Sequence, residues 1–127
     1  MTKVVVLGHG GYGTAIKNNL AMLLGELEGF YYIDFNPEHN VDDLNAEIQK
    51  IISDDLNQDV LFACDLTGGS PFRQACLLAV DHPSFVVVAG LNTSGYAEIA
   101  YALDLKPMEL AEMAMTATKE SISVFHI

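Results

Sequence analysis

A run of four apolar residues that leads directly into a glycine turn is the feature that most limits how this chain can fold. Val4–Leu7 precede the glycine-rich turn Gly8–Gly13, and a helical pattern starts immediately afterwards. A short, wholly apolar run is typical of a parallel strand buried on both faces. Glycines let the backbone turn tightly, and the free N–H groups of a following helix attract an anion. The stretch therefore predicts a strand–turn–helix unit with an anion site, and His9 lies inside the turn.

The same alternation of strand-like and helix-like segments continues along the chain, which is typical of βαβ units. The pattern predicts strands at 3–8, 30–35, 59–65 and 84–90, and helices at 11–27, 41–54, 70–81, 96–103 and 107–119. We predict one domain, 1–127, with an α/β fold: a three-layer α/β/α sandwich around a mainly parallel sheet of order 2-1-3-4. Asn40 and Ser70 are the expected N-caps of the second and third helices. The tail Ser121–Ile127 alternates apolar and polar residues, which favours an added antiparallel edge strand.

The acidic composition excludes some partners. Seventeen Asp and Glu against six Lys and Arg give a net charge of −11, which disfavours nucleic acid and favours proteins with a basic face. Cys64 and Cys76 lie in apolar surroundings and indicate free thiols of a reducing compartment. No window approaches the roughly 20 apolar residues of a membrane span, and no signal pattern is visible. We expect a cytoplasmic protein without direct membrane insertion.

Two other functions fit parts of the pattern. The spacing Gly8-x-Gly10-x-x-Gly13 matches the dinucleotide-binding fingerprint, and Asp34 lies near the place of that fold's ribose-binding acid. A full dinucleotide fold needs about six strands, however, and its fingerprint does not explain a second glycine turn. Asp65 also fits the phosphoacceptor of a response-regulator receiver, but the acidic pair of receivers is missing after the first strand. A nucleotide- or dinucleotide-binding regulatory or oxidoreductase module stays open as the alternative.

The second glycine turn indicates a different chemistry. In the order 2-1-3-4 the first and third strands are neighbours, so that His9 and Asp65 at their carboxyl ends face each other. A carboxylate beside an imidazole fixes its tautomer and leaves the other ring nitrogen free as a nucleophile. Gly68, Gly69 and Ser70, at the start of the next helix, offer N–H groups to phosphoryl oxygens. Together these residues predict a phosphohistidine site that requires no metal and no other cofactor.

The residues at these turns also resemble a known family. The matching parts are Gly8–Gly10 after a strand, Tyr32–Phe35, and the block Asp65–Phe72, which reads D-x-x-G-G-S-P-F. In order and spacing, over essentially the whole chain, they are similar to the IIA component of the mannose-type family of the bacterial sugar phosphotransferase system.

The resemblance implies a phosphotransferase that works through a phosphohistidine intermediate in sugar uptake. His9 would accept a phosphoryl group on Nε2 from the phosphocarrier HPr. It would pass the group to a IIB component, which phosphorylates the sugar during transport by the membrane components IIC and IID. Asp65 would orient His9, while Ser70 and the Gly68–Gly69 backbone would help to bind the phosphoryl group. The rim of the site is expected at three further positions: Gly10, Thr67 and Asn92.

The resemblance also implies a homodimer, because mannose-specific members exchange a C-terminal strand between subunits, and Ser121–Ile127 fits that strand. The chain departs from the family pattern in three ways. Thr67 stands where mannose-specific members tend to have an aromatic residue, and Asn92–Gly95 replaces an Asn-x-Pro-Met turn. The linker and IIB domain of some members are missing, which predicts IIB as a separate polypeptide. The first two departures leave the sugar and the partner surface open.

Overall fold

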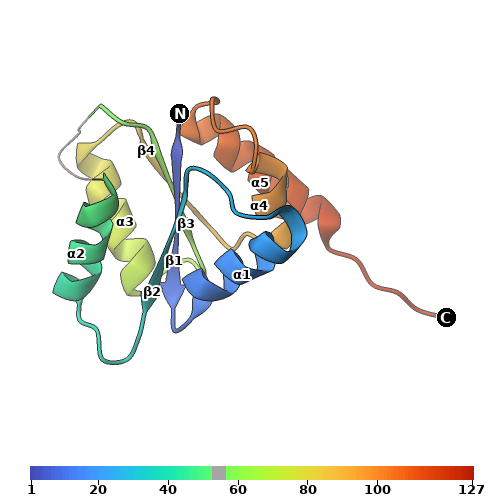
Figure 1. Cartoon of the computed structure of the whole chain (residues 1–127), viewed down its shortest axis with the longest axis horizontal. Helices are drawn as coiled ribbons and strands as arrows, with labels where there is room; N and C mark the ends of the chain where they lie inside the picture. The colour runs from blue at the N-terminus through green and yellow to red at the C-terminus, as the bar shows by residue number, and fades with distance from the viewer. Residues whose placement is uncertain (53–56) are drawn as a thin grey trace.

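The computed structural model describes residues 1–52 and 57–127, and within them a four-stranded parallel sheet lies between two layers of helices (Figure 1). The strands are β1 (Lys3–His9), β2 (Phe30–Phe35), β3 (Val60–Cys64) and β4 (Phe85–Ala89). The helices are α1 (Tyr12–Leu24), α2 (Val41–Ile52), α3 (Gly69–Asp81), α4 (Thr93–Ile99) and α5 (Pro107–Ser121). The sheet order β2-β1-β3-β4 confirms the predicted order 2-1-3-4.

The apolar run of β1 is buried on both faces of the sheet. Val4 and Val6 belong to a core with residues of α1, α4 and α5, whereas Val5 and Leu7 belong to a core with residues of α2 and α3. All four side chains are fully buried. Figure 1 shows the corresponding layers, with α2 and α3 on one side of the sheet and α1, α4 and α5 on the other. Because successive side chains of a strand point to opposite faces, one unbroken apolar run supplies both cores.

The cap predicted for α2 is confirmed. The side-chain oxygen of Asn40 accepts the backbone N–H of Asp43 (2.8 Å), and the Asp43 carboxylate accepts the N–H of Asn40 (2.9 Å). Two N–H groups that the helix leaves unpaired are thereby satisfied. The predicted end of this helix near Asp54 lies outside the described residues.

Two other helix boundaries differ from the prediction. Helix α1 ends at Leu24 and not near Leu27, because Gly25 takes a φ of +82° and ends the helical path. Helix α4 begins at Thr93, earlier than expected, because the side chain of Asn92 accepts the N–H of Gly95 and caps the helix. The turn predicted at 92–95 is therefore the first turn of a helix.

The predicted C-terminal edge strand does not form in the single chain. Residues 122–127 follow α5 without regular structure and extend away from the domain (Figure 1). Helix α5 carries the chain away from the sheet, so the tail has no strand of its own molecule to pair with. Its apolar side chains are consequently exposed: Ile122, Val124, Phe125 and Ile127. Within the described part of the chain, no helix is long and apolar enough to cross a bilayer.

Candidate functional site

The carboxyl ends of β1 and β3 bring His9 and Asp65 together, as the sequence predicts. The two strands are direct neighbours, with Leu7 opposite Cys64, and the N–H of Asp65 donates to the carbonyl of Leu7 (3.2 Å). His9 is the last residue of β1, and Asp65 follows the last residue of β3. Their meeting is therefore set by the parallel register of the sheet.

The carboxylate of Asp65 holds both the backbone and the ring of His9. Its Oδ2 accepts the N–H of His9 (3.0 Å) and lies 2.8 Å from Nδ1 of the imidazole, while Oδ1 accepts the N–H of Leu66 (3.0 Å). Burial by itself would raise the pKa of Asp65. The hydrogen bonds from His9, its charge and the N–H of Leu66 outweigh burial and lower the pKa below its ordinary value. Asp65 is therefore ionised at neutral pH and accepts a hydrogen bond from the N–H at Nδ1, which leaves Nε2 as the unprotonated nitrogen of the neutral ring.

The free nitrogen of His9 lies against the start of α3. A Cβ placed on Gly69 would be 2.8 Å from Cε1 and 3.1 Å from Nε2 of His9, so that only glycine leaves room for the ring here. The helix begins at Gly69 with Gly68 as its N-cap, which corrects the predicted cap at Ser70. Positive φ angles at Gly68 (+86°) and Gly69 (+78°) start the helix two residues earlier than a serine cap would. Pro71 lies in the first turn, as predicted.

This start of α3 has properties of an anion site. Among the described residues, no side chain caps the helix, and no acidic residue lies in its first turn. The N–H groups of the first turn have no partner within the helix, and the helix dipole adds positive potential there. Gly69 thus lies next to Nε2 of His9, and Gly68 and Ser70 flank it in the chain at the start of the helix.

Phe35 forms a further wall of the site that the sequence reasoning missed. It lies opposite His9 in the register of β1 and β2, and the two rings meet edge to face with centroids 6.1 Å apart. The N–H of Gly10 donates to the carbonyl of Phe35 (2.8 Å), which ties the turn to β2. The sequence did offer a signal for Phe35: in the predicted sheet order the first two strands are neighbours, so the end of the second strand lies beside His9. With 44% of its side chain exposed, His9 stays open to solvent between these walls.

The other predicted rim residues lie in different surroundings. Gly10, with a φ of +58°, directly follows His9, and Thr67 is an exposed residue of the turn before α3. The amide of Asn92 is already engaged, because it caps α4 and donates to the hydroxyl of Ser121 (2.7 Å).

Asp34, the acid of the dinucleotide hypothesis, is occupied by the protein itself. Its carboxylate accepts the backbone N–H of Thr14 (2.9 Å) and also the Thr14 hydroxyl. The acid therefore satisfies the first turn of α1, and its oxygens are not held ready for a ribose. Gly13 has a packing reason of its own, since a Cβ there would lie 2.7 Å from the carbonyl oxygen of Ile33.

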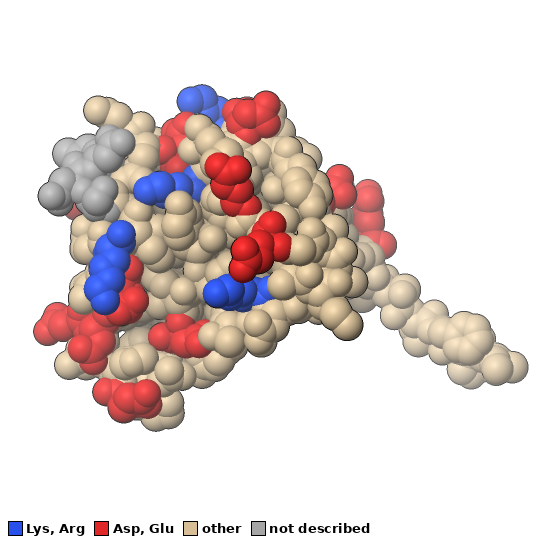
Figure 2. Space-filling model, viewed as in Figure 1, with Lys and Arg blue, Asp and Glu red and all other residues tan. Residues whose placement is uncertain are grey.

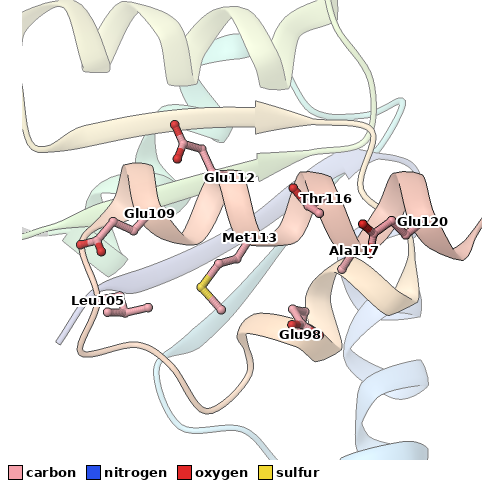
Figure 3. Close-up of a pocket in the computed structure, with 8 residues that line it drawn as sticks. All are labelled: Glu98, Leu105, Glu109, Glu112, Met113, Thr116, Ala117 and Glu120. Carbon is pink, nitrogen blue, oxygen red and sulfur yellow. The ribbon is translucent and has the colours of Figure 1, made fainter.

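A separate hollow of about 470 Å³ lies beside α5, and no residue of the His9 site lines it. Its walls combine four glutamates with a few apolar side chains, and Figure 3 shows them projecting from α5, from α4 and from the loop between these helices. The lining residues are Glu98, Leu105, Glu109, Glu112, Met113, Thr116, Ala117 and Glu120. Within the described residues, no group of three or more His, Cys, Asp or Glu could hold a metal ion.

The comparison with protein families agrees with the geometry of the His9 site. The family model described as "PTS system fructose IIA component" matches residues 3–94, which include β1, β3 and the start of α3. The chain belongs to the mannose-type EIIA family of the sugar phosphotransferase system (PTS). Members of this family are phosphoryl-transfer components, and the resemblance seen at Gly8–Gly10 and Asp65–Phe72 is thereby confirmed.

Several EIIA relatives match most of the chain. It is 36% identical over 129 residues to the mannose-specific EIIAB component of Escherichia coli (strain K12), covering 96% of this chain. The chain spans about two fifths (39%) of the length of that relative. The sorbose-specific EIIA component of Klebsiella pneumoniae is 29% identical over 92 residues, which are 72% of this chain and 67% of that protein. The crystal structure of an EIIA component from Streptococcus agalactiae superposes with a TM-score of 0.88 at 25% identity, covering 98% of this chain and 97% of that one.

Proposed function

We propose that His9 is the phosphoryl carrier of this EIIA component, accepting the group on Nε2 from phosphorylated HPr and passing it to a IIB component. One observation carries the proposal: Asp65 holds Nδ1 at 2.8 Å, while Nε2 faces Gly69 at the open start of α3. A nucleophile, a group that orients it and donors for the incoming charge therefore meet at one point.

The hydrogen bond to Asp65 sets the direction of the chemistry. With the proton on Nδ1, the lone pair of Nε2 attacks phosphorus. The Nε2–P bond forms as the bond from phosphorus to the donor breaks, and the electron pair of that bond stays with the donor. The phosphorylated ring keeps its Nδ1 proton and becomes cationic, and the Asp65 carboxylate offsets that charge. Transfer to IIB reverses these steps with IIB as the nucleophile.

The start of α3 provides donors for the phosphoryl oxygens. The N–H groups of Gly68, Gly69 and Ser70, with the Ser70 hydroxyl, are assigned to this role. Phosphoryl transfer needs mainly positioning and charge stabilisation, which a helix N-terminus beside a fixed imidazole supplies.

The charge of the protein supports repeated docking to basic partners. Its net charge is −11, and acidic side chains outnumber basic ones on the face drawn in Figure 2. Opposite charges raise the rate of encounter, which suits a carrier that meets HPr and IIB in turn. In the relay that we propose, the membrane components IIC and IID act on the sugar only after IIB.

The exposed tail supports a homodimer. Four apolar side chains of residues 122–127 are exposed in the single chain, and β4 has a neighbour only on its β3 side among the described strands. Pairing of the tail with a second copy would bury these side chains and cover an open sheet edge. Analytical ultracentrifugation should give a dimer for the full chain and a monomer for a variant that ends at Ser121. A monomeric full chain would refute the dimer.

Phosphorylation in a reconstituted system tests the carrier role. The purified chain, mixed with enzyme I, HPr and 32P-labelled phosphoenolpyruvate, should take up one acid-labile phosphoryl group. His9→Ala should take up none, whereas His82→Ala should behave as the wild type, because His82 follows the far end of α3 and its Nδ1 hydrogen-bonds to the carbonyl of Leu78. Labelling of His9→Ala would overturn the assignment.

A further inference from the structure

Two tyrosines connect the His9 turn to the helix layer formed by α1, α4 and α5. Tyr12 is the first residue of α1, and its hydroxyl forms a hydrogen bond with the hydroxyl of Tyr96 in α4. Tyr96 is fully buried and Tyr12 is half-buried. Because the Tyr96 ring is enclosed by the core, its hydroxyl is a fixed point that holds the end of the Tyr12 side chain.

The ring of Tyr12 lies beside the carboxylate that orients His9. A Cβ placed on Gly8 would be 2.7 Å from Cδ2 of Tyr12 and 2.8 Å from both Cβ and Cγ of Asp65. The ring edge and the Asp65 side chain therefore flank the same point above Gly8. Only 13% of the Asp65 side chain is exposed, and the aromatic ring closes part of its surroundings.

The electrostatics of the phenol agree with this placement. Burial raises the pKa of Tyr12 most; the hydrogen bond with Tyr96 opposes it, and the charge of Asp65 raises the pKa further. The charge of Asp65 is thus close enough to act on the phenol of Tyr12.

We propose that Tyr12 is a positioning residue for Asp65. Its rigid ring, held by Tyr96, limits the carboxylate to the rotamer in which Oδ2 binds Nδ1 of His9, and thereby keeps Nε2 unprotonated. The ring needs no contact with the phosphoryl group for this role. The importance of Tyr12 for phosphoryl transfer rests on the proposed carrier function, but its effect on the tautomer of His9 does not.

The 15N chemical shifts of the His9 ring at neutral pH measure this tautomer in the unphosphorylated protein. The wild type should show the Nδ1–H form. Tyr12→Leu, which removes the ring, should lower the ratio of the Nδ1–H to the Nε2–H form by about tenfold, as expected for the loss of one charge-assisted hydrogen bond. Tyr12→Phe keeps the ring and should retain most of the wild-type ratio. Asp65→Asn gives the ratio expected when no carboxylate orients the ring.

A purely structural role of Tyr12 would leave the His9 tautomer unchanged in a folded variant, so a wild-type ratio in Tyr12→Leu overturns the proposal. If Tyr12→Leu does not fold, Tyr12→Met keeps most of the volume without a rigid ring, and the same criterion applies to it. A changed tautomer in Tyr12→Leu, together with a wild type that HPr does not phosphorylate, would support the role of Tyr12 and refute the carrier function. The two ideas therefore fail by different results.

Discussion

Gly69→Ala should disturb His9 directly. The new Cβ would lie 2.8 Å from Cε1 and 3.1 Å from Nε2 of the imidazole. Both separations are shorter than ordinary van der Waals contact, so that the ring has to move. Because 44% of the His9 side chain is exposed, it can swing outward, and this movement weakens its hydrogen bond with Asp65.

Gly25→Ala is the matched control for the backbone strain of this substitution. Gly25 has a φ of +82°, close to the +78° of Gly69, but a Cβ there meets no atom within 4 Å. A backbone with such a positive φ costs a non-glycine residue about 1–3 kcal/mol. Both variants should lose this much free energy of unfolding, and their Tm should fall by roughly 4 °C for each kcal/mol in a domain of this size.

The rate of phosphorylation should separate the two variants. A hydrogen bond to a charged group contributes about 1.5–3 kcal/mol, and about 1.4 kcal/mol corresponds to a factor of ten in rate. Gly69→Ala should therefore slow phosphorylation by phospho-HPr by about tenfold or more, whereas Gly25→Ala should react as the wild type below its Tm. Initial rates of 32P transfer, measured for each protein over the same series of phospho-HPr concentrations, test this difference. Equal rates would refute the placement of Nε2 against Gly69.

Two further predictions concern stability. The lowered pKa of Asp65 stabilises the fold above the unfolded pKa of about 4, and this contribution is lost as the pH falls through the folded value. Urea titrations should give wild type a larger free energy of unfolding than Asp65→Asn at about pH 5, and this difference should shrink as the pH falls below about 4; a difference that grows below about pH 4 would contradict this. Tyr12→Phe should cost about 1–3 kcal/mol, since it leaves the buried Tyr96 hydroxyl unpaired. Tyr96→Phe should cost less, because Tyr12, whose hydroxyl then loses its partner, is half-buried whereas Tyr96 is fully buried; the reverse order would refute this.

The main features of the site could be predicted because they depend on regular structure. Once alternating strands and helices imply a parallel sheet, the carboxyl ends of neighbouring strands must lie side by side. His9 and Asp65 follow the first and third strands directly, so the sheet order alone brings them together. The glycine turn before α3 likewise marks a helix start at the same edge.

The details that the sequence did not predict depend on backbone angles and distant contacts. Helix α3 begins before Ser70, because two consecutive glycines adopt a positive φ that a Ser-Pro cap rule does not anticipate. Asp34 has the position of a ribose ligand in the sequence, but its carboxylate binds Thr14. Thr14 lies in α1, which follows the neighbouring strand β1, and the sequence gives no sign of this contact. The hydrogen bond between Tyr12 and Tyr96 joins residues 84 positions apart, and no local pattern announces it.

The tail shows a different limit of sequence reasoning. The alternation in Ser121–Ile127 predicted an edge strand, but a strand forms only where it finds a partner. In the single chain α5 leads the tail away from the sheet, so the pattern stays unpaired (Figure 1). A periodic pattern therefore predicts which face of a strand is apolar, without specifying which molecule completes the sheet.

The nitrogen that carries the phosphoryl group tests the central claim most directly. Wild-type protein labelled with 15N-histidine and phosphorylated through HPr can be analysed by 15N and 31P NMR. The hydrogen bond between Asp65 and Nδ1 predicts a single phosphohistidine at His9, with phosphorus bonded to Nε2 and the proton retained on Nδ1. Phosphorus on Nδ1 of His9, or on His39, His82 or His126, would contradict the account.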